Sequence, residues 1–234
     1  MQYFIGDVHS NSVELKKLLD QLKLKKSDML IFLGDYVDKN ANTKETLEIL
    51  WSLNENYKCV FIKGNHEYVW EKYLNHGEYF RQDFLLKYGS AEALRQYVKN
   101  PEELILKNDV KAIKKLLEPY LKLIEITNDY YLTDKYLAIH AGLLKEQLDQ
   151  KEIKMQELNY FLRKDKIDFN NLYLSKYVIV AGHSYFGDEP LIEKGYISID
   201  LGAGFGRYLG ALDSEGNKII RSDGKIFDIL KKYE

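Results

Sequence analysis

The strongest constraint on the fold is an alternation of short apolar runs and helical patterns at the start of the chain. The apolar runs cover residues 2–5, 29–33 and 57–62, which is the length of buried strands. Between them, residues 12–24 and 43–53 place leucines at near-helical spacing. This order favours parallel pairing, because parallel neighbours need a crossover connection that is usually a helix. The sequence therefore predicts an α/β fold.

The rest of the chain divides into a helical stretch and a strand-rich stretch. Residues 67 to about 125 carry helical periods, which Gly89, Pro101 and Pro119 interrupt. Further strands are expected at residues 135–139, 177–180, 197–201, 208–212 and 218–220. The sequence contains no internal repeat and no low-complexity linker. We therefore expect a single domain over residues 1–234, with a helical insertion around residues 68–125.

Polar side chains follow five of the expected strands, at the point where each strand ends. Four of the five histidines of the chain lie at these ends. In open α/β sheets, ligands collect beyond the carboxyl ends of the strands, so these side chains are expected to converge. In chain order they are Asp7 and His9; Asp35, Asp38 and Lys39; Asn65 and His66; His140; and His183.

The residue types in this set point to a metal centre. Taken singly, each has an ordinary explanation, because an Asp after a strand often caps a helix and a lone His is often structural. Together, carboxylate, amide oxygen and imidazole form a ligand set that suits Mn, Fe and Zn. A structural zinc site would more usually use cysteine, and Cys59 is the only one in the chain. The sequence therefore predicts a catalytic metal site.

The same motifs resemble those of a known family, the calcineurin-like metallophosphoesterases. Within that family they are most similar to the phosphoprotein phosphatase branch and its small bacterial and phage members. The resemblance covers most of the chain and implies a two-sheet β-sandwich flanked by helices, with the site at one sheet edge. The matching motifs are Gly6-Asp7-x-His9, Gly34-Asp35-x-x-Asp38, Gly64-Asn65-His66-Glu67, His140-Ala141-Gly142 and Gly182-His183.

The resemblance implies two divalent metal ions bridged by Asp35. The first metal would also take Asp7 and His9, and the second would take Asn65, His140 and His183. Mn²⁺ is the metal expected first, and Fe and Zn also suit the ligands. The implied chemistry is direct in-line attack on phosphorus by a hydroxide that bridges the two metals.

The resemblance also assigns the general acid. His66 would protonate the leaving oxygen, and Asp38 would hold its imidazole in the right tautomer and raise its pKa. For Asp38, a helix cap is the alternative role.

Phosphate binding is expected from Lys39, Arg163 and Asn65. The family places an arginine where this chain has Lys39, and a lysine cannot form a bidentate fork on a phosphate. Arg163 corresponds to the second family arginine, and a plain surface arginine is the alternative.

Three functions are compatible with these residues. The first is a phosphomonoester hydrolase, specifically a serine/threonine protein phosphatase. The second is a symmetrical dinucleoside tetraphosphatase or another hydrolase of nucleotide phosphoanhydrides, and His9 favours the first over it. The third is a non-catalytic metal-binding scaffold, which would require Lys39 to be disabling. The expected substrates are phosphoproteins, or phosphorylated small molecules and nucleotides.

Charge and hydropathy bear on the partners and the cellular location of the chain. Lys+Arg is 34 and Asp+Glu is 36, so a formal net charge of -2 argues against dedicated nucleic-acid binding. No apolar stretch approaches the roughly 18–20 residues of a membrane span, and no signal peptide is apparent. With one cysteine the chain cannot form an internal disulfide. We expect a cytoplasmic protein without membrane contact.

Overall fold

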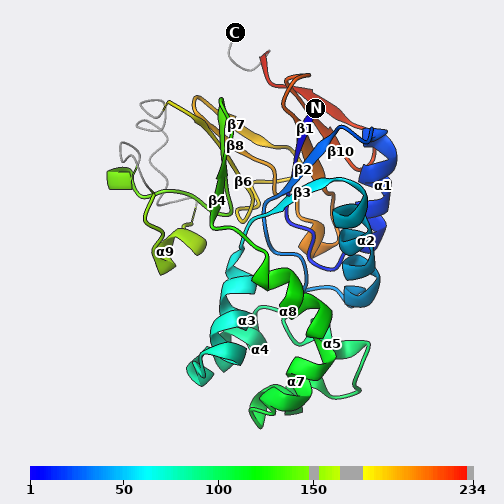
Figure 1. Cartoon of the computed structure of the whole chain (residues 1–234), viewed down its shortest axis with the longest axis vertical. Coiled ribbons are helices and arrows are strands. Elements are labelled where there is room, and N and C mark those ends of the chain that lie inside the picture. Colours follow the sequence, from blue (N-terminus) through cyan, green and yellow to red (C-terminus); the bar gives the residue numbers. More distant parts are fainter. Residues whose placement is uncertain (148–152, 164–175, 231–234) are drawn as a thin grey trace.

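Two β-sheets carry the structure, a computed structural model that describes residues 1–147, 153–163 and 176–230 (Figure 1). The first sheet has the order β11-β10-β9-β1-β2-β3. Its strands β1, β2 and β3 pair in parallel, as the alternation of strands and helices predicted, and β9 to β11 are antiparallel. The strands are β1 (Gln2–Ile5), β2 (Met29–Phe32), β3 (Lys58–Phe61), β9 (Gly210–Asp213), β10 (Lys218–Arg221) and β11 (Ile226–Asp228).

The second sheet has the order β4-β5-β6-β8-β7. Its three central strands, β5, β6 and β8, pair in parallel, and the edge strands β4 and β7 are antiparallel to their neighbours. The strands are β4 (Tyr130–Leu132), β5 (Tyr136–Ile139), β6 (Val178–Ala181), β7 (Leu191–Glu193) and β8 (Tyr196–Ser198).

The two sheets pack face to face over a shared apolar core. Phe4 of β1 contacts Tyr136 of β5 edge to face, with ring centroids 5.3 Å apart. Neighbouring side chains from both sheets complete this layer, among them Ile31, Leu212, Val180 and Ile197. Burial on both faces explains why the central strands are uniformly apolar rather than alternating. The two-sheet sandwich implied by the family resemblance is confirmed.

Two helices cover the outer face of the first sheet, α1 (Ser12–Leu22) and α2 (Thr43–Asn56) (Figure 1). Leu15 and Leu18 of α1 pack in one cluster with Tyr3 and Phe32 of the sheet. Asn11 caps α1, because its side-chain oxygen accepts a hydrogen bond from the Glu14 N–H at 3.1 Å. This cap and the packed leucines hold the start of α1, and with it the loop after β1, in place against the sheet.

The predicted helical insertion is confirmed, and it groups at one end of the molecule (Figure 1). Pro101 lies at the first position of its helix, where its missing N–H costs nothing. The helices are α3 (Asn65–Asn75), α4 (Gln82–Lys87), α5 (Glu92–Arg95), α6 (Pro101–Leu106), α7 (Val110–Leu116) and α8 (Glu118–Glu125). The short helix α9 (Glu157–Tyr160) lies between β5 and β6 in the chain. No helix in the described ranges combines the length and the apolar character that crossing a membrane requires.

Two expected strands are shifted in the structure. The run at residues 197–201 pairs only through β8, which ends at Ser198, because the chain turns at Asp200 and Gly202 adopts a left-handed φ of 85°. The run at residues 208–212 begins pairing at Gly210. The predictions missed β4, β7 and β11, which are three-residue strands at sheet edges.

Candidate metal and phosphate site

The polar residues at the strand ends come together as predicted, at the carboxyl ends of parallel strands. Asp7 and His9 follow β1, and Asp35 follows β2. Asn65 and His66 form the first turn of α3, directly after β3. His140 follows β5 and His183 follows β6, so both sheets contribute to the site.

The loops that carry these side chains have an unusual backbone. Of the nine described non-glycine residues with positive φ, six lie in the loops after β1, β2 and β6. They include His9 at 46°, Asp35 at 53°, Asp38 at 73° and His183 at 61°. A left-handed φ costs free energy for residues other than glycine, and such strain collects at functional sites. This backbone is what turns the side chains toward one another.

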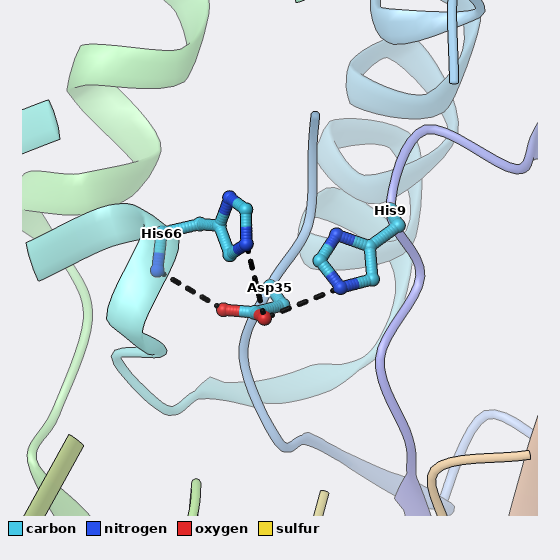
Figure 2. A group of neighbouring side chains, drawn as sticks. All are labelled: His9, Asp35 and His66. Carbon is cyan, nitrogen blue, oxygen red and sulfur yellow. Dashed lines mark hydrogen bonds and ion pairs between the residues drawn. The ribbon is translucent and has the colours of Figure 1, made fainter. Parts of the chain in front are cut away.

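Asp35 lies at the centre of the site and belongs to two groups of side chains that could each hold a metal ion. Its carboxylate is buried, and Oδ2 lies 3.2 Å from His9 Nε2 and 3.9 Å from His66 Nε2 (Figure 2). The other oxygen, Oδ1, lies 3.4 Å from His140 Nε2. The first group is His9, Asp35 and His66, and the second is Asp35, His140 and His183, with the donor atoms of each group within 4.8 Å of one another.

Backbone carbonyls fix the tautomers of two of these histidines. His9 Nδ1 lies 3.0 Å from the Val37 carbonyl oxygen, and His140 Nδ1 lies 2.7 Å from that of Leu33. A carbonyl oxygen only accepts, so Nδ1 carries the proton and Nε2 of the neutral ring presents a lone pair. Each lone pair therefore faces an oxygen of Asp35. Such a convergence of acceptors fits a cation between them, so the residues suit the divalent metals implied by the resemblance.

The protonation states of the site also suit metal binding. Burial lowers the pKa of His9 to about 4 and that of His183 to about 3, and it lowers the pKa of His140 as well. Burial alone would raise the pKa of Asp35, but His140 and His66 hold it well below its usual range. Neutral imidazoles around an ionised carboxylate are the forms that bind a metal.

Asn65 joins the second group through its side-chain amide. Its Oδ1 lies 2.8 Å from His140 Nε2 and 2.9 Å from His183 Nδ1. The structure therefore brings together Asn65, His140, His183 and Asp35, the four residues expected around the second metal. Their role as ligands stays a prediction.

Asp7 lies at the edge of this arrangement, outside the two groups. Both of its carboxylate oxygens accept a hydrogen bond from the His183 backbone N–H, at 3.1 and 2.9 Å. Burial and the charges of Asp200 and Asp35 raise the pKa of Asp7 well above its usual range. Asp200 is a buried carboxylate that sequence reasoning missed, because residue 200 fell inside an expected strand. The expected role of Asp7 at the first metal stays a prediction.

His66 and Asp38 form a buried pair beside the metal groups. His66 Nδ1 lies 2.6 Å from Asp38 Oδ2, which leaves Nε2 facing Asp35. Two residues from the helical insertion hold the Asp38 carboxylate: Trp70 Nε1 donates to both oxygens at 3.1 Å, and Ser90 Oγ donates at 2.5 Å. Burial opposes protonation of His66, but the Asp35 charge and the Asp38 hydrogen bond raise its pKa. The pair has the geometry of an oriented general acid.

Glu67 holds the loop that carries Asp35 through hydrogen bonds to its backbone, and the sequence did not predict this contact. Its buried carboxylate accepts hydrogen bonds from the backbone N–H groups of Asp35 at 2.8 Å and Tyr36 at 3.1 Å. The Tyr120 hydroxyl of α8 donates to it at 2.7 Å. Burial and the Asp35 charge raise the pKa of Glu67 to about 7. The motif position of Glu67 was the available signal, but its partner Tyr120 is too distant in the chain to be paired by pattern.

A cavity of about 710 Å³ opens over these residues, and the predicted phosphate-binding residues line it. Lys39 Nζ lies 2.8 Å from His9 Nε2. Arg163 is exposed on the cavity wall. The segment before it is anchored because Asn159 Nδ2 donates to the Gly142 carbonyl at 3.0 Å, beside the His140 loop. The cavity is lined by Asp35, Lys39, Asn65, His66, Phe84, Tyr88, Phe161, Arg163, His183, Ser184, Tyr185 and Phe205.

Comparison with known proteins gives three findings. The sequence model of the calcineurin-like phosphoesterase family matches residues 3–211. A Bacillus cereus protein named bis(5'-nucleosyl)-tetraphosphatase PrpE [asymmetrical] is 25% identical over 100% of this chain and 98% of its own length. The Caenorhabditis elegans protein C06A1.3, named as a serine/threonine-protein phosphatase, is 35% identical over 27% of this chain, and this chain covers 18% of its length.

Solved structures support the fold. The crystal structure of a cold-active protein tyrosine phosphatase superposes with a TM-score of 0.62, covering 97% of this chain and 77% of that one at 18% identity. At that identity the likeness concerns the fold alone.

Proposed function

Because this chain belongs to the calcineurin-like phosphoesterase family and is a phosphatase that depends on divalent metals, we propose that it hydrolyses phosphate monoesters on proteins. The motif resemblance favours phosphoserine and phosphothreonine as the substrates. We further propose Asp7, His9, Asp35, Asn65, His140 and His183 as the metal ligands, with Asp35 shared.

One observation carries this proposal. His9 and His140 each direct Nε2 toward a different oxygen of Asp35, at 3.2 and 3.4 Å. One carboxylate thereby serves two neighbouring cation positions, which is the arrangement that two-metal phosphate hydrolysis needs. Both positions border the cavity that also exposes His66, Lys39 and Arg163.

We assign each residue of the site a separate role in the reaction. Bound divalent cations would supply an activated water and neutralise charge on the phosphoryl oxygens. Lys39 and Arg163 add positive charge that attracts and orients the phosphate. His66, held by Asp38, would give its proton to the leaving oxygen, so that an alkoxide need not depart. Asp38 itself is fully buried, so its carboxylate is not exposed to bulk water.

A second candidate function is supported by the Bacillus cereus relative, which aligns over the whole chain. A dinucleoside tetraphosphate would present a phosphoanhydride to the same metal positions. The expected alternative is symmetrical cleavage into two molecules of ADP, whereas the name of the relative describes asymmetrical cleavage.

The experiment that tests both functions is phosphate release by metal-stripped protein to which Mn²⁺ is added back. Peptides carrying phosphoserine, phosphothreonine or phosphotyrosine are compared with diadenosine tetraphosphate, whose nucleotide products are separated. Fast peptide turnover with little tetraphosphate cleavage supports the first function. Efficient tetraphosphate cleavage with slow peptide turnover supports the second. A matched Asp35→Asn protein should be inactive on every substrate, because both metal positions share that carboxylate.

A further inference from the structure

Five aromatic rings line the cavity beside the charged residues of the site, and we call them the aromatic lining. They are Phe84, Tyr88, Phe161, Tyr185 and Phe205. Phe84, Tyr88 and Phe161 form one contiguous group, in which the Phe84 ring centroid lies 4.6 Å from that of Tyr88 and 5.9 Å from that of Phe161. Tyr185 and Phe205 form a second group, with centroids 5.8 Å apart. The proposed phosphate chemistry requires metals, cations and an acid, and it gives these rings no role.

The aromatic lining begins next to the proposed acid. The Phe84 ring meets the His66 ring edge to face, with centroids 5.3 Å apart. His66 is the group that would protonate the leaving oxygen. The first atoms attached to that oxygen would therefore lie near Phe84, and the leaving group would extend along the first group of rings.

None of the five rings is fully buried, and all of them line the cavity. The side chain of Phe205 is 64% exposed and that of Tyr88 is 45% exposed, while Phe84 and Phe161 are half-buried. Lys39 Nζ lies 4.9 Å from the centroid of Phe205, so the same cation contacts both the ring and the floor of the site. Open aromatic faces beside a phosphate-binding cation favour a ligand that carries a planar ring close to its phosphate.

We propose that this cavity binds phosphate monoesters whose leaving group is an aromatic ring, such as a tyrosyl side chain, in preference to aliphatic esters. The inference rests on the proposed monoesterase function and narrows its substrate. It places phosphotyrosine ahead of the phosphoserine and phosphothreonine that the motifs favour. In the reaction, water forms a new oxygen–phosphorus bond and releases one proton, and the aryl oxygen–phosphorus bond breaks. His66 supplies the proton that converts the departing phenolate to a phenol, and the proton released by the water restores that of His66.

Binding rather than turnover must be measured, because a phenolate is a better leaving group than an alkoxide in any phosphatase. Phenylphosphonate and cyclohexylphosphonate match in size, carry a carbon–phosphorus bond that is not hydrolysed, and differ in having a planar aromatic ring. Titration calorimetry with the Mn²⁺-loaded protein should give a Kd about fivefold lower for phenylphosphonate.

Variants test whether the aromatic lining causes the preference for phenylphosphonate. Phe84→Leu should reduce the ratio of the two Kd values toward one, with little change for cyclohexylphosphonate. Phe205→Leu, at an exposed position, should reduce the ratio partly and keeps the test available if Phe84→Leu does not fold. Phe80→Leu is the matched control, since its side chain is 73% exposed and does not line the cavity. Equal affinities in the unaltered protein, or an unchanged ratio in both variants, would overturn the proposal.

Hydrolysis separates this proposal from the function on which it rests. Release of phosphate from a phosphoserine peptide without any preference for the aromatic phosphonate would remove the role of the aromatic lining and leave the monoesterase intact. No release from any monoester would remove the proposed function, whatever the two Kd values are.

Discussion

At the scale of single residues, the proposed acid His66 is the side chain whose replacement should affect turnover most directly. Its Nδ1 is held by Asp38, and its Nε2 faces the cavity side of Asp35. Replacing His66 by Asn should lower kcat about 10²- to 10⁴-fold, because the leaving oxygen loses its acid. The bound metal should stay at the level of the unaltered protein, measured by elemental analysis after dialysis.

His76→Asn is the control, since His76 is exposed at the end of the same helix. It should keep full activity. His66 also lies within the first group of side chains that could hold a metal. A drop in bound metal for His66→Asn would therefore contradict its role as an acid and make it a ligand.

Asp38 should control the pH at which His66 loses its proton. The hydrogen bond from His66 to Asp38 raises the pKa of His66, so removing the negative charge in Asp38→Asn should lower that pKa. An acid is active while protonated, so the basic limb of the kcat profile should move to lower pH, and kcat should fall about 10- to 100-fold. When both proteins carry the same bound metals, the difference between their kcat profiles shows the effect of Asp38 alone.

The control for this change is Asp83→Asn, at an exposed carboxylate of α4. Its profile should coincide with that of the unaltered protein. If the basic limb of the kcat profile stays at the same pH in Asp38→Asn, Asp38 does not tune His66 and has only a structural role, such as a helix cap.

Lys39 tests what a lysine does at a position where the family has an arginine. An arginine would offer a planar fork with more than one donor to a phosphate, whereas the ammonium group acts as a point charge. Lys39→Arg should therefore lower the inhibition constant of inorganic phosphate about fivefold, through one additional net hydrogen bond. Lys107→Arg, on an exposed helix, should leave it unchanged. Weaker phosphate inhibition in Lys39→Arg would mean that the loop is shaped for the lysine.

The convergence of the polar residues at the strand ends could be predicted because its signal is local. Gly-Asp-x-His and Gly-Asn-His-Glu place functional side chains directly after a strand, and the structure brings them together. The residues that hydrogen-bond to Asp38 and Glu67 could not be predicted in the same way. Trp70, Ser90 and Tyr120 reach Asp38 or Glu67 from positions that are 32 to 53 residues away in the chain. Only tertiary packing decides such contacts.

At the scale of elements, the contact between α8 and the start of α3 joins the helical insertion to the site. The Tyr120 hydroxyl donates to the buried Glu67 carboxylate at 2.7 Å. Tyr120→Phe should lower the free energy of unfolding by about 1.5–3 kcal/mol, because a hydrogen bond to a buried charged group is lost. Urea unfolding of the metal-free protein measures this change.

Tyr57→Phe is the control, because the Tyr57 hydroxyl makes no hydrogen bond to another described residue. It should change the free energy of unfolding by no more than about 0.5 kcal/mol. Equal effects of the two substitutions would mean that the insertion is not coupled to the site through Glu67.

The elements that were predicted and those that were missed differ in how they are buried. The strand β2 is apolar and buried throughout, and β1 is so after Gln2, since both faces of these strands are covered. The missed strands β4, β7 and β11 have three residues each and lie at or beside sheet edges. Such strands are defined by pairing with a neighbour, and a run of three residues carries too little periodicity to reveal it.

At the scale of the whole molecule, both sheets converge on a region rich in buried carboxylates. Asp7, Asp35, Asp38, Glu67 and Asp200 are all buried there. Among the described residues that line the cavity over this region, the lysine and arginine side chains are Lys39 and Arg163. In the metal-free chain, burial and the neighbouring carboxylates raise the pKa of Asp7 and of Glu67, and bound cations should relieve the repulsion between the carboxylates that stay ionised.

Metal addition should accordingly stabilise the fold. At a free Mn²⁺ concentration 100-fold above Kd, binding to the folded state adds about 2.7 kcal/mol to the free energy of unfolding. For a chain of this size this corresponds to a rise in Tm of about 5–10 °C, measured by calorimetry of stripped protein with and without Mn²⁺. The imidazoles in both groups favour Mn²⁺ and Zn²⁺ over Ca²⁺, which prefers oxygen ligands. Equal concentrations of Ca²⁺ should therefore raise Tm much less.

The Asp35→Asn protein distinguishes specific binding from general screening of the acidic region. Losing the shared carboxylate should abolish most of the rise in Tm with Mn²⁺, although the other buried carboxylates remain. A rise that persists in Asp35→Asn, or that Ca²⁺ reproduces in full, would mean that the cations screen diffuse charge. A rise confined to Mn²⁺ and to intact Asp35 would mean that the ends of the two sheets are held together by metal bound at the predicted centre.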